Sequence, residues 1–151
     1  MSDQISYFPL FIDISDKKIA VIGGGSIATR RVRTLADFGA KITVISPDIT
    51  ESIAQMVEND IVSYKKEHYK KESIRNADIV LACSDKPQIN HIVFADCREL
   101  GIMVNNCSDR QECDFYFPGV VKREHVVVGV TASGNDHKLA KKIREQIEDM
   151  I

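Results

Sequence analysis

The chain has 151 residues, of which 44% are hydrophobic and 28% charged, and its formal net charge at pH 7 is −2. This length and balance fit one principal globular domain with at most a small appendage, and the slight acidity argues against nucleic-acid binding. The sequence has no run of about 18 apolar residues and its start lacks the pattern of a secretion signal, so we expect a cytoplasmic protein without a membrane span.

The first informative segment is KIAVIGGGSIATRRVR at residues 18–33, where an apolar run enters three glycines and then an amphipathic pattern. The order Gly23-x-Gly25-x-x-Ala28 matches the dinucleotide-binding fingerprint with alanine in its third position. In such a turn the first glycine permits a tight bend, the second leaves room for a pyrophosphate, and helix N–H groups face the phosphates. The predicted cradle comprises Gly23, Gly24, Gly25, Ser26 and Ile27. The alternative is a structural turn that binds no nucleotide.

Strand-like and helix-like segments continue to alternate up to residue 105. Strands are predicted at 41–45, 61–65, 77–83 and 102–105, and helices at 49–57, 70–76 and 87–100. This alternation indicates an α/β fold, a Rossmann-like doubly wound parallel sheet. We assign residues 1–114 to this dinucleotide-binding domain.

The residues after the strands are further candidates for dinucleotide contacts, because ligands of open α/β sheets bind at the carboxyl ends of the strands. Ser46, Pro47 and Asp48 follow the second strand, where an acid usually holds the ribose. Ser84 and Asp85 follow the fourth. Asp48, Ser84 and Asp85 also fit a second role, as caps of the helices that follow. No arginine follows the second strand to hold a 2′-phosphate, which favours NAD over NADP.

From residue 115 the pattern changes. Two strand-like runs at 115–121 and 126–132, joined by a polar turn, predict an antiparallel hairpin, and a helical pattern follows at 137–151. One hairpin and one helix bury little apolar surface by themselves. The hairpin is apolar on both faces, so it needs more cover than one chain supplies. We therefore expect residues 115–151 to be a dimerisation region and the protein to be a homodimer.

The four cysteines, Cys83, Cys97, Cys107 and Cys113, include no CxxC pair, and the four histidines have no ligand spacing. We therefore predict thiols and no metal site. Cys83 and Cys97 fit core positions, whereas Cys107 and Cys113 flank the segment that carries the catalytic candidates.

Seven motifs spread over the chain are together far more specific than the glycine turn. They are FPLF at 8–11, GGGSIATRR at 23–31, FGAKITVISP at 38–47, ACSD at 82–85, VN at 104–105, CDFYFP at 113–118 and LAKKIRE at 139–145. With these motifs the chain resembles the precorrin-2 dehydrogenases, which also form the N-terminal part of siroheme synthase. The resemblance implies NAD binding, a dimer and oxidation of precorrin-2 to sirohydrochlorin, with iron or cobalt insertion in some members. The family's helical third region is expected to be absent, since the sequence stops at Ile151.

The family pattern places its proposed catalytic aspartate shortly after Val-Asn. Counting back from Phe115 and Pro118 puts Ser108 at that position and Asp109 next to it, so these two are the catalytic candidates. Water can take the proton released after hydride loss, whereas metal insertion needs a placed base. Ser108 therefore argues against chelatase activity more than against dehydrogenase activity. Asp109 is either a substitute base or a solvated loop residue.

The resemblance also implies basic groups for the carboxylates of precorrin-2. Candidates are Arg30, Arg31, Lys122, Arg123 and Lys138, of which the first two fit plain surface charges equally well. Two rival functions remain open from the sequence: a Rossmann module that senses a nucleotide in a regulator, and a non-catalytic partner subunit.

Overall fold

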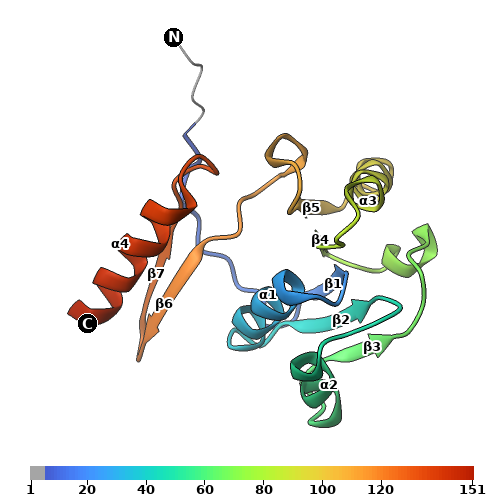
Figure 1. Ribbon diagram of the computed structural model, residues 1–151, viewed down its shortest axis with the longest axis horizontal. Helices are drawn as coiled ribbons and strands as arrows, with labels where there is room; N and C mark the ends of the chain where they lie inside the picture. The colour runs from blue at the N-terminus through green and yellow to red at the C-terminus, as the bar shows by residue number, and fades with distance from the viewer. Residues whose placement is uncertain (1–5) are drawn as a thin grey trace. The chain divides into compact units, whose positions relative to one another are not determined.

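The computed structural model describes residues 6–151, which divide into two compact units (Figure 1). The larger unit is Ile12–Asp114, and the smaller one combines residues 6–11 with Phe115–Ile151. The division at residue 114 falls where the sequence pattern changes. The described N-terminal residues group with the tail, and the stacking of the Tyr7 ring on the Tyr116 ring, with centroids 3.9 Å apart, links the two segments.

The larger unit is built on a five-stranded sheet. Its strands are β1 (Lys18–Ile22), β2 (Lys41–Ile45), β3 (Ser63–Lys65), β4 (Ile79–Ala82) and β5 (Met103–Asn106), in the order β3-β2-β1-β4-β5. All neighbouring strands run parallel. The chain therefore winds outward from β1, first toward β3 and then toward β5, and the predicted doubly wound α/β fold is confirmed.

The helices cover both faces of this sheet. They are α1 (Ser26–Ala36), α2 (Glu51–Glu58) and α3 (Pro87–Leu100), with short 3-10 helices η1 (Lys71–Ile74) and η2 (Arg110–Glu112). Right-handed crossovers place α1 and α2 on one face and α3 on the other, because the winding direction reverses between them. On the α3 face, Val93 and Cys97 pack into one buried cluster with Ala20, Val80 and Val104.

Several element boundaries differ from the sequence prediction. The hairpin strands, predicted at 115–121 and 126–132, are Gly119–Arg123 and Val126–Val130. The helix predicted from residue 49 begins at Glu51, and the segment 70–76 forms only the four-residue η1. Strand β3 begins at Ser63 because Ile61 and Val62 are still part of the turn that ends α2, where both N–H groups donate to the Met56 carbonyl. In α3, Ile92, which the helical period of apolar residues places on the buried face, is 49% exposed.

The smaller unit is an antiparallel hairpin followed by a helix, as predicted. Strands β6 (Gly119–Arg123) and β7 (Val126–Val130) pair through a turn in which Glu124 has a positive φ of 50°. Helix α4 (His137–Met150) is capped by Asp136, whose carboxylate accepts a hydrogen bond from the Leu139 N–H at 2.9 Å.

Helix α4 turns only one of its faces toward the hairpin. Arg144 lies against Gly119 of β6, where an added Cβ would be 3.0 Å from the arginine Cδ. Leu139, Ile143 and Met150, which share an adjacent stripe of the helix, are exposed by 47%, 38% and 76%. The smaller unit thus leaves an apolar stripe on α4 uncovered. Within residues 6–151, no helix has the length and apolar character needed to cross a membrane.

Candidate dinucleotide-binding and active site

The loops that follow the parallel strands all begin at one edge of the sheet. The ladder extends one residue past the strands: the Gly23 N–H donates to the Ile45 carbonyl at 3.0 Å, and the Cys83 N–H donates to the Ile22 carbonyl at 2.7 Å. The site residues predicted from the sequence all lie at or just beyond this carboxyl edge. They are Gly23, Gly24, Gly25, Ser26, Ile27, Ser46, Pro47, Asp48, Ser84, Asp85, Ser108 and Asp109.

The glycine turn has the form that a pyrophosphate requires. Gly23 has a φ of 121°, and a Cβ there would lie 2.5 Å from the Cys83 carbonyl oxygen, so only glycine fits. A Cβ on Gly25 would meet no atom within 4 Å, so the space in front of α1 is open. Gly25 is also the N-cap of α1, and no side chain caps the first-turn N–H groups. These groups and the helix dipole fit an anionic ligand.

Gly24 has a different role, which the sequence did not reveal. A Cβ at this position would lie 2.1 Å from the backbone oxygen of Asp48. The Gly24 carbonyl accepts a hydrogen bond from the Thr50 N–H at 3.0 Å. The second glycine thus lets the loop after β2 pack directly on the loop after β1.

The cap of α2 is Thr50, so the alternative of Asp48 as the cap is wrong. The Thr50 hydroxyl accepts from the Ile53 N–H at 3.3 Å and lies 2.8 Å from the Thr29 hydroxyl, which donates to the Gly25 carbonyl at 2.7 Å. From the sequence, Asp48 fitted this role as an alternative because Ile49 resembled the first apolar residue of the helix, although threonine is also a cap residue. Asp48 remains exposed at the end of β2, where the predicted ribose contact stays a prediction.

Ser84 and Asp85 do not cap α3 either, because Lys86 occupies the cap position and no side chain makes a capping hydrogen bond to the first turn of the helix. The Ser84 hydroxyl accepts a hydrogen bond from the Lys86 N–H itself, at 3.1 Å. Ser84 is held instead by Asn90, a residue that the sequence analysis missed. The Ser84 N–H donates to the Asn90 Oδ1 at 3.0 Å, and the Asn90 Nδ2 donates to the Ser84 carbonyl at 2.9 Å. Asn90 is 0% exposed, and the signal that was available is an amide at a core position of an otherwise apolar helix stripe.

The same amide reaches the loop after β5. The Asn90 Nδ2 lies 3.1 Å from the Ser108 Oγ, and the Ser108 hydroxyl and N–H both donate to the Asn106 Oδ1, at 2.8 and 2.9 Å. Asp109 is exposed and caps η2, with its carboxylate accepting from the Gln111 N–H at 2.9 Å. Ser108 is therefore held in place by two amides, and Asp109 has the structural role of a loop cap.

Arg30 is exposed, whereas its neighbour Arg31 is partly buried and makes contacts inside the larger unit. Arg31 extends from α1 to the ends of β4 and β5, where its Nη1 donates to the Asn105 Oδ1 at 2.5 Å and lies 3.7 Å from the Cys83 Sγ. All four cysteines are free thiols. Among the described residues, no three His, Cys, Asp or Glu side chains are grouped as metal ligands.

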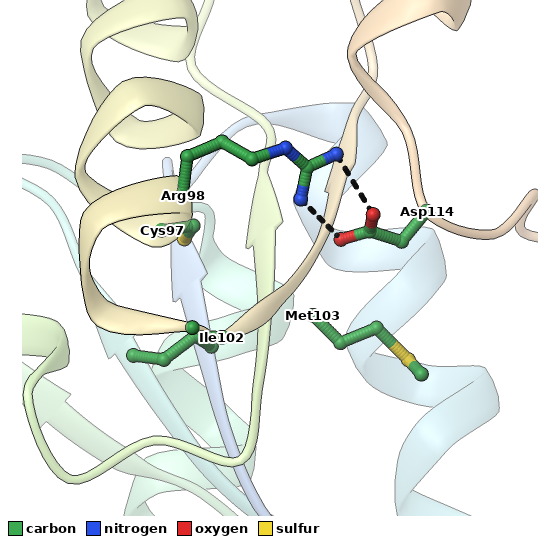
Figure 2. Close-up of a pocket in the computed structure, with 6 residues that line it drawn as sticks. Cys97, Arg98, Ile102, Met103 and Asp114 are labelled. Atoms are coloured by element: carbon green, nitrogen blue, oxygen red, sulfur yellow. Dashed lines mark hydrogen bonds and ion pairs between the residues drawn. The ribbon is translucent and has the colours of Figure 1, made fainter.

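A hollow of about 370 Å³ lies at the opposite end of β5, beside Met103, the first residue of that strand (Figure 2). Figure 2 shows Arg98 facing Asp114 across this hollow, with N···O distances of 3.0 and 2.8 Å. Asp114 also accepts from the Val104 N–H at 2.8 Å. Burial raises the pKa of Asp114, but its hydrogen bonds with Arg98 and Val104 outweigh this effect and lower the pKa. The hollow thus contains an ion pair with a structural role, and it lies at the end of the sheet opposite the predicted site residues.

Comparisons with known proteins show the family to which the chain belongs. A family model described as "Putative NAD(P)-binding" matches residues 10–119. The "Precorrin-2 dehydrogenase" of Bacillus subtilis is 36% identical over 143 residues, which are 95% of this chain and 88% of that protein. The chain belongs to the precorrin-2 dehydrogenase and siroheme synthase family. A protein of Ruminiclostridium josui, "Probable multifunctional siroheme biosynthesis protein HemA", is 41% identical over 93% of this chain.

Two further findings define the extent of these similarities. The chain spans 27% of the R. josui protein and 26% of a siroheme synthase from Psychrobacter arcticus, which is 35% identical. The solved structure "SirC, precorrin-2 dehydrogenase" superposes with a TM-score of 0.78 over 96% of this chain and 71% of that one. At 21% identity this match supports the fold, including the hairpin and closing helix.

Proposed function

We propose that this protein oxidises precorrin-2 to sirohydrochlorin with NAD, as a step in siroheme biosynthesis. The observation that carries the proposal is the similarity to the B. subtilis precorrin-2 dehydrogenase, which extends over 88% of that protein's length. The open space at Gly25 and the uncapped start of α1 support it independently, because a dehydrogenase of this fold binds its dinucleotide there.

In the proposed complex, the first-turn N–H groups at Gly25, Ser26 and Ile27 bind the pyrophosphate, and residues 46–48 contact the adenosine. NAD, when bound, supplies the hydride acceptor, so the protein mainly has to position the substrate. The exposed carboxylate of Asp48 favours a ribose hydroxyl over a 2′-phosphate. Lys65 and Lys66, which are exposed at the end of neighbouring β3, are the residues that could instead hold a 2′-phosphate.

The role of Ser108 in this reaction is limited by its hydrogen bonds. Its hydroxyl donates to Asn106 and faces the Asn90 amide, so it is not available as a base. Loss of hydride leaves a conjugated, cationic ring system whose N–H can give its proton to water. We therefore propose that dehydrogenation proceeds without a carboxylate at position 108. Metal insertion requires a base to take the pyrrolic protons, and we expect it to be slow here.

The exposed basic residues are the proposed partners of the substrate carboxylates, since charge-assisted hydrogen bonds bind carboxylates strongly. They are Arg30, Lys122, Arg123 and Lys138. Arg31 is the weaker candidate because it already bonds to Asn105.

The test is an anaerobic absorbance scan of precorrin-2 with the purified protein and either NAD or NADP. The expected result is conversion to sirohydrochlorin that is faster with NAD. Binding of NAD without conversion would instead favour the nucleotide-sensing module. Conversion that is faster with NADP, and that Lys65→Ala slows, would overturn the preference for NAD.

A homodimer is the second part of the proposal. The uncovered stripe of Leu139, Ile143 and Met150 supports it, because a second copy would remove these side chains from water. Light scattering should report about twice 16.9 kDa for the intact chain, and Ile143→Glu should shift the protein toward the monomer. Lys141→Gln, which changes the net charge by the same −1 at an exposed residue on the opposite side of α4, is the control. A wild-type monomer at micromolar concentration would contradict the dimer.

A further inference from the structure

Two cysteines occupy equivalent positions at the ends of β4 and β5. The register of this strand pair ends with Ala82 opposite Asn106, and the next residue on each strand is a cysteine, Cys83 and Cys107. The Cys107 N–H donates to the Ala82 carbonyl at 3.0 Å, so the ladder continues to these residues. Neighbouring strands lie about 4.8 Å apart, within the roughly 4.4–6.8 Å between Cα atoms that a disulfide spans.

The two thiols are in direct contact. A side-chain hydrogen bond joins Cys83 and Cys107, the Arg31 Nη1 lies 3.7 Å from the Cys83 Sγ, and the Asn90 Nδ2 lies 3.8 Å from the Cys107 Sγ. Cys83 is 5% exposed, whereas Cys107 is only partly buried. An oxidant from solvent therefore reaches Cys107 first.

Their surroundings make the two thiols chemically different. The hydrogen bond with Cys83 lowers the pKa of the Cys107 thiol to about 7, burial opposes this shift, and the charge of Arg31 adds to it. The same hydrogen bond and burial raise the pKa of Cys83. Burial also raises the pKa of Cys113, the other thiol in this loop. Since the thiolate is the nucleophile, Cys107 is the reactive thiol of the three.

We propose that Cys107 is a redox-active thiol that reacts with hydroperoxides, and that Cys83 converts the product into a disulfide. In the first step the Cys107 thiolate attacks a peroxide oxygen, so an S–O bond forms, the O–O bond breaks and an alkoxide or hydroxide leaves and is protonated. In the second, the Cys83 sulfur attacks the Cys107 sulfenic acid, an S–S bond forms and water leaves with the Cys83 proton. Two thiols lose two electrons and the peroxide gains them.

This inference does not depend on the proposed substrate, because its primary readout is the state of the thiols. The two cysteines nevertheless lie at the carboxyl edge of the sheet, beside the predicted dinucleotide site. Gly23 packs on the Cys83 carbonyl and Ser84 N–H so closely that no Cβ fits between them. A shift of Cys83 toward Cys107 would therefore be transmitted to the glycine turn.

The first test is peptide mapping of the intact protein after treatment with hydrogen peroxide. Trypsin combined with a protease that cuts before aspartate leaves each of the four cysteines in its own peptide. The expected product links the peptide of Cys83 to that of Cys107, and dithiothreitol reverses it. Cys113→Ser is the matched control and should give the same link. A Cys107–Cys113 link, or four reduced thiols in the treated wild type, would overturn the proposal.

The second test separates the roles of the two thiols. At pH 7 a thiol of pKa about 7 is about half thiolate, against about 3% for an ordinary cysteine, so iodoacetamide should label Cys107 at least threefold faster than Cys113. In Cys83→Ser, peroxide should leave a sulfenic acid on Cys107 that dimedone captures. Cys107→Ser should abolish both the label and the link. Preferential labelling of Cys113 would show that Cys107 is not the reactive thiol.

Discussion

Gly25→Asp should separate folding from dinucleotide binding, because the two effects have opposite signs. The N-cap Gly25 has φ −90° and ψ −157°, which any residue adopts, and a Cβ there has nothing within 4 Å. Aspartate is a favoured N-cap, better than glycine by a few tenths of a kcal/mol. For a chain of this length that raises Tm by about 1–2 °C.

The same side chain takes the N–H groups that the pyrophosphate needs and places a negative charge among them. We expect NAD affinity to fall at least about 10-fold, which is about 1.4 kcal/mol. Calorimetric titration measures the affinity and thermal unfolding measures Tm. Gly25→Asn is the matched control, since it caps α1 without the charge and shows how much of the loss is steric. A folded Asp variant with wild-type affinity would refute the assignment of the phosphate site.

Three further changes have defined outcomes. Asp114→Asn should lower the unfolding free energy by about 1–2 kcal/mol at pH 7 in urea titrations. Because the pKa of Asp114 is lowered in the folded protein, the difference between wild type and variant should shrink as the pH falls below about 4. A difference that does not change with pH would contradict the pairing with Arg98. Asn90→Ala should cost about 2–3 kcal/mol through the polar groups left unpaired at Ser84 and Ser108, whereas a loss under about 1 kcal/mol would show that water replaces the amide. Ser108→Ala should keep dehydrogenation within about tenfold, below the roughly 100-fold cost of losing a general base, and Ser108→Asp should raise metal insertion more than dehydrogenation; efficient insertion by the wild type would contradict this.

The local parts of this structure could be predicted from the sequence. The glycine turn, the parallel strands and α3 follow from short patterns, namely an apolar run, a turn residue and a helical period. Gly101 illustrates why: with a φ of 68° it ends α3 at the predicted residue, since glycine adopts that conformation without strain.

The parts that were missed depend on partners distant in sequence. Thr50 was overlooked as a cap because part of its role comes from Thr29, 21 residues earlier, on another helix. Asn90 bonds to Ser108, 18 residues later, and one sequence offers no sign of that pairing. The exposure of Ile92 has the same cause, because the buried stripe of α3 passes through Asn90 rather than through the most apolar residues.

The hydrogen bonds of Asn90 explain how the two halves of the site edge are held together. The register of β4 and β5 ends at Ala82 and Asn106, and one further backbone bond, from the Cys107 N–H to the Ala82 carbonyl, joins the two segments. One buried amide bonds to Ser84 on the first loop and Ser108 on the second, so neither loop can move without breaking a bond to it. Because the predicted cofactor contacts lie on the first loop and the catalytic candidates on the second, a fixed distance between them preorganises the site before any ligand binds. A leucine at position 90 could pack in the core but could not hold the two loops in place. A buried amide holds them because the hydrogen bonds that offset its cost of burial form only in this one arrangement.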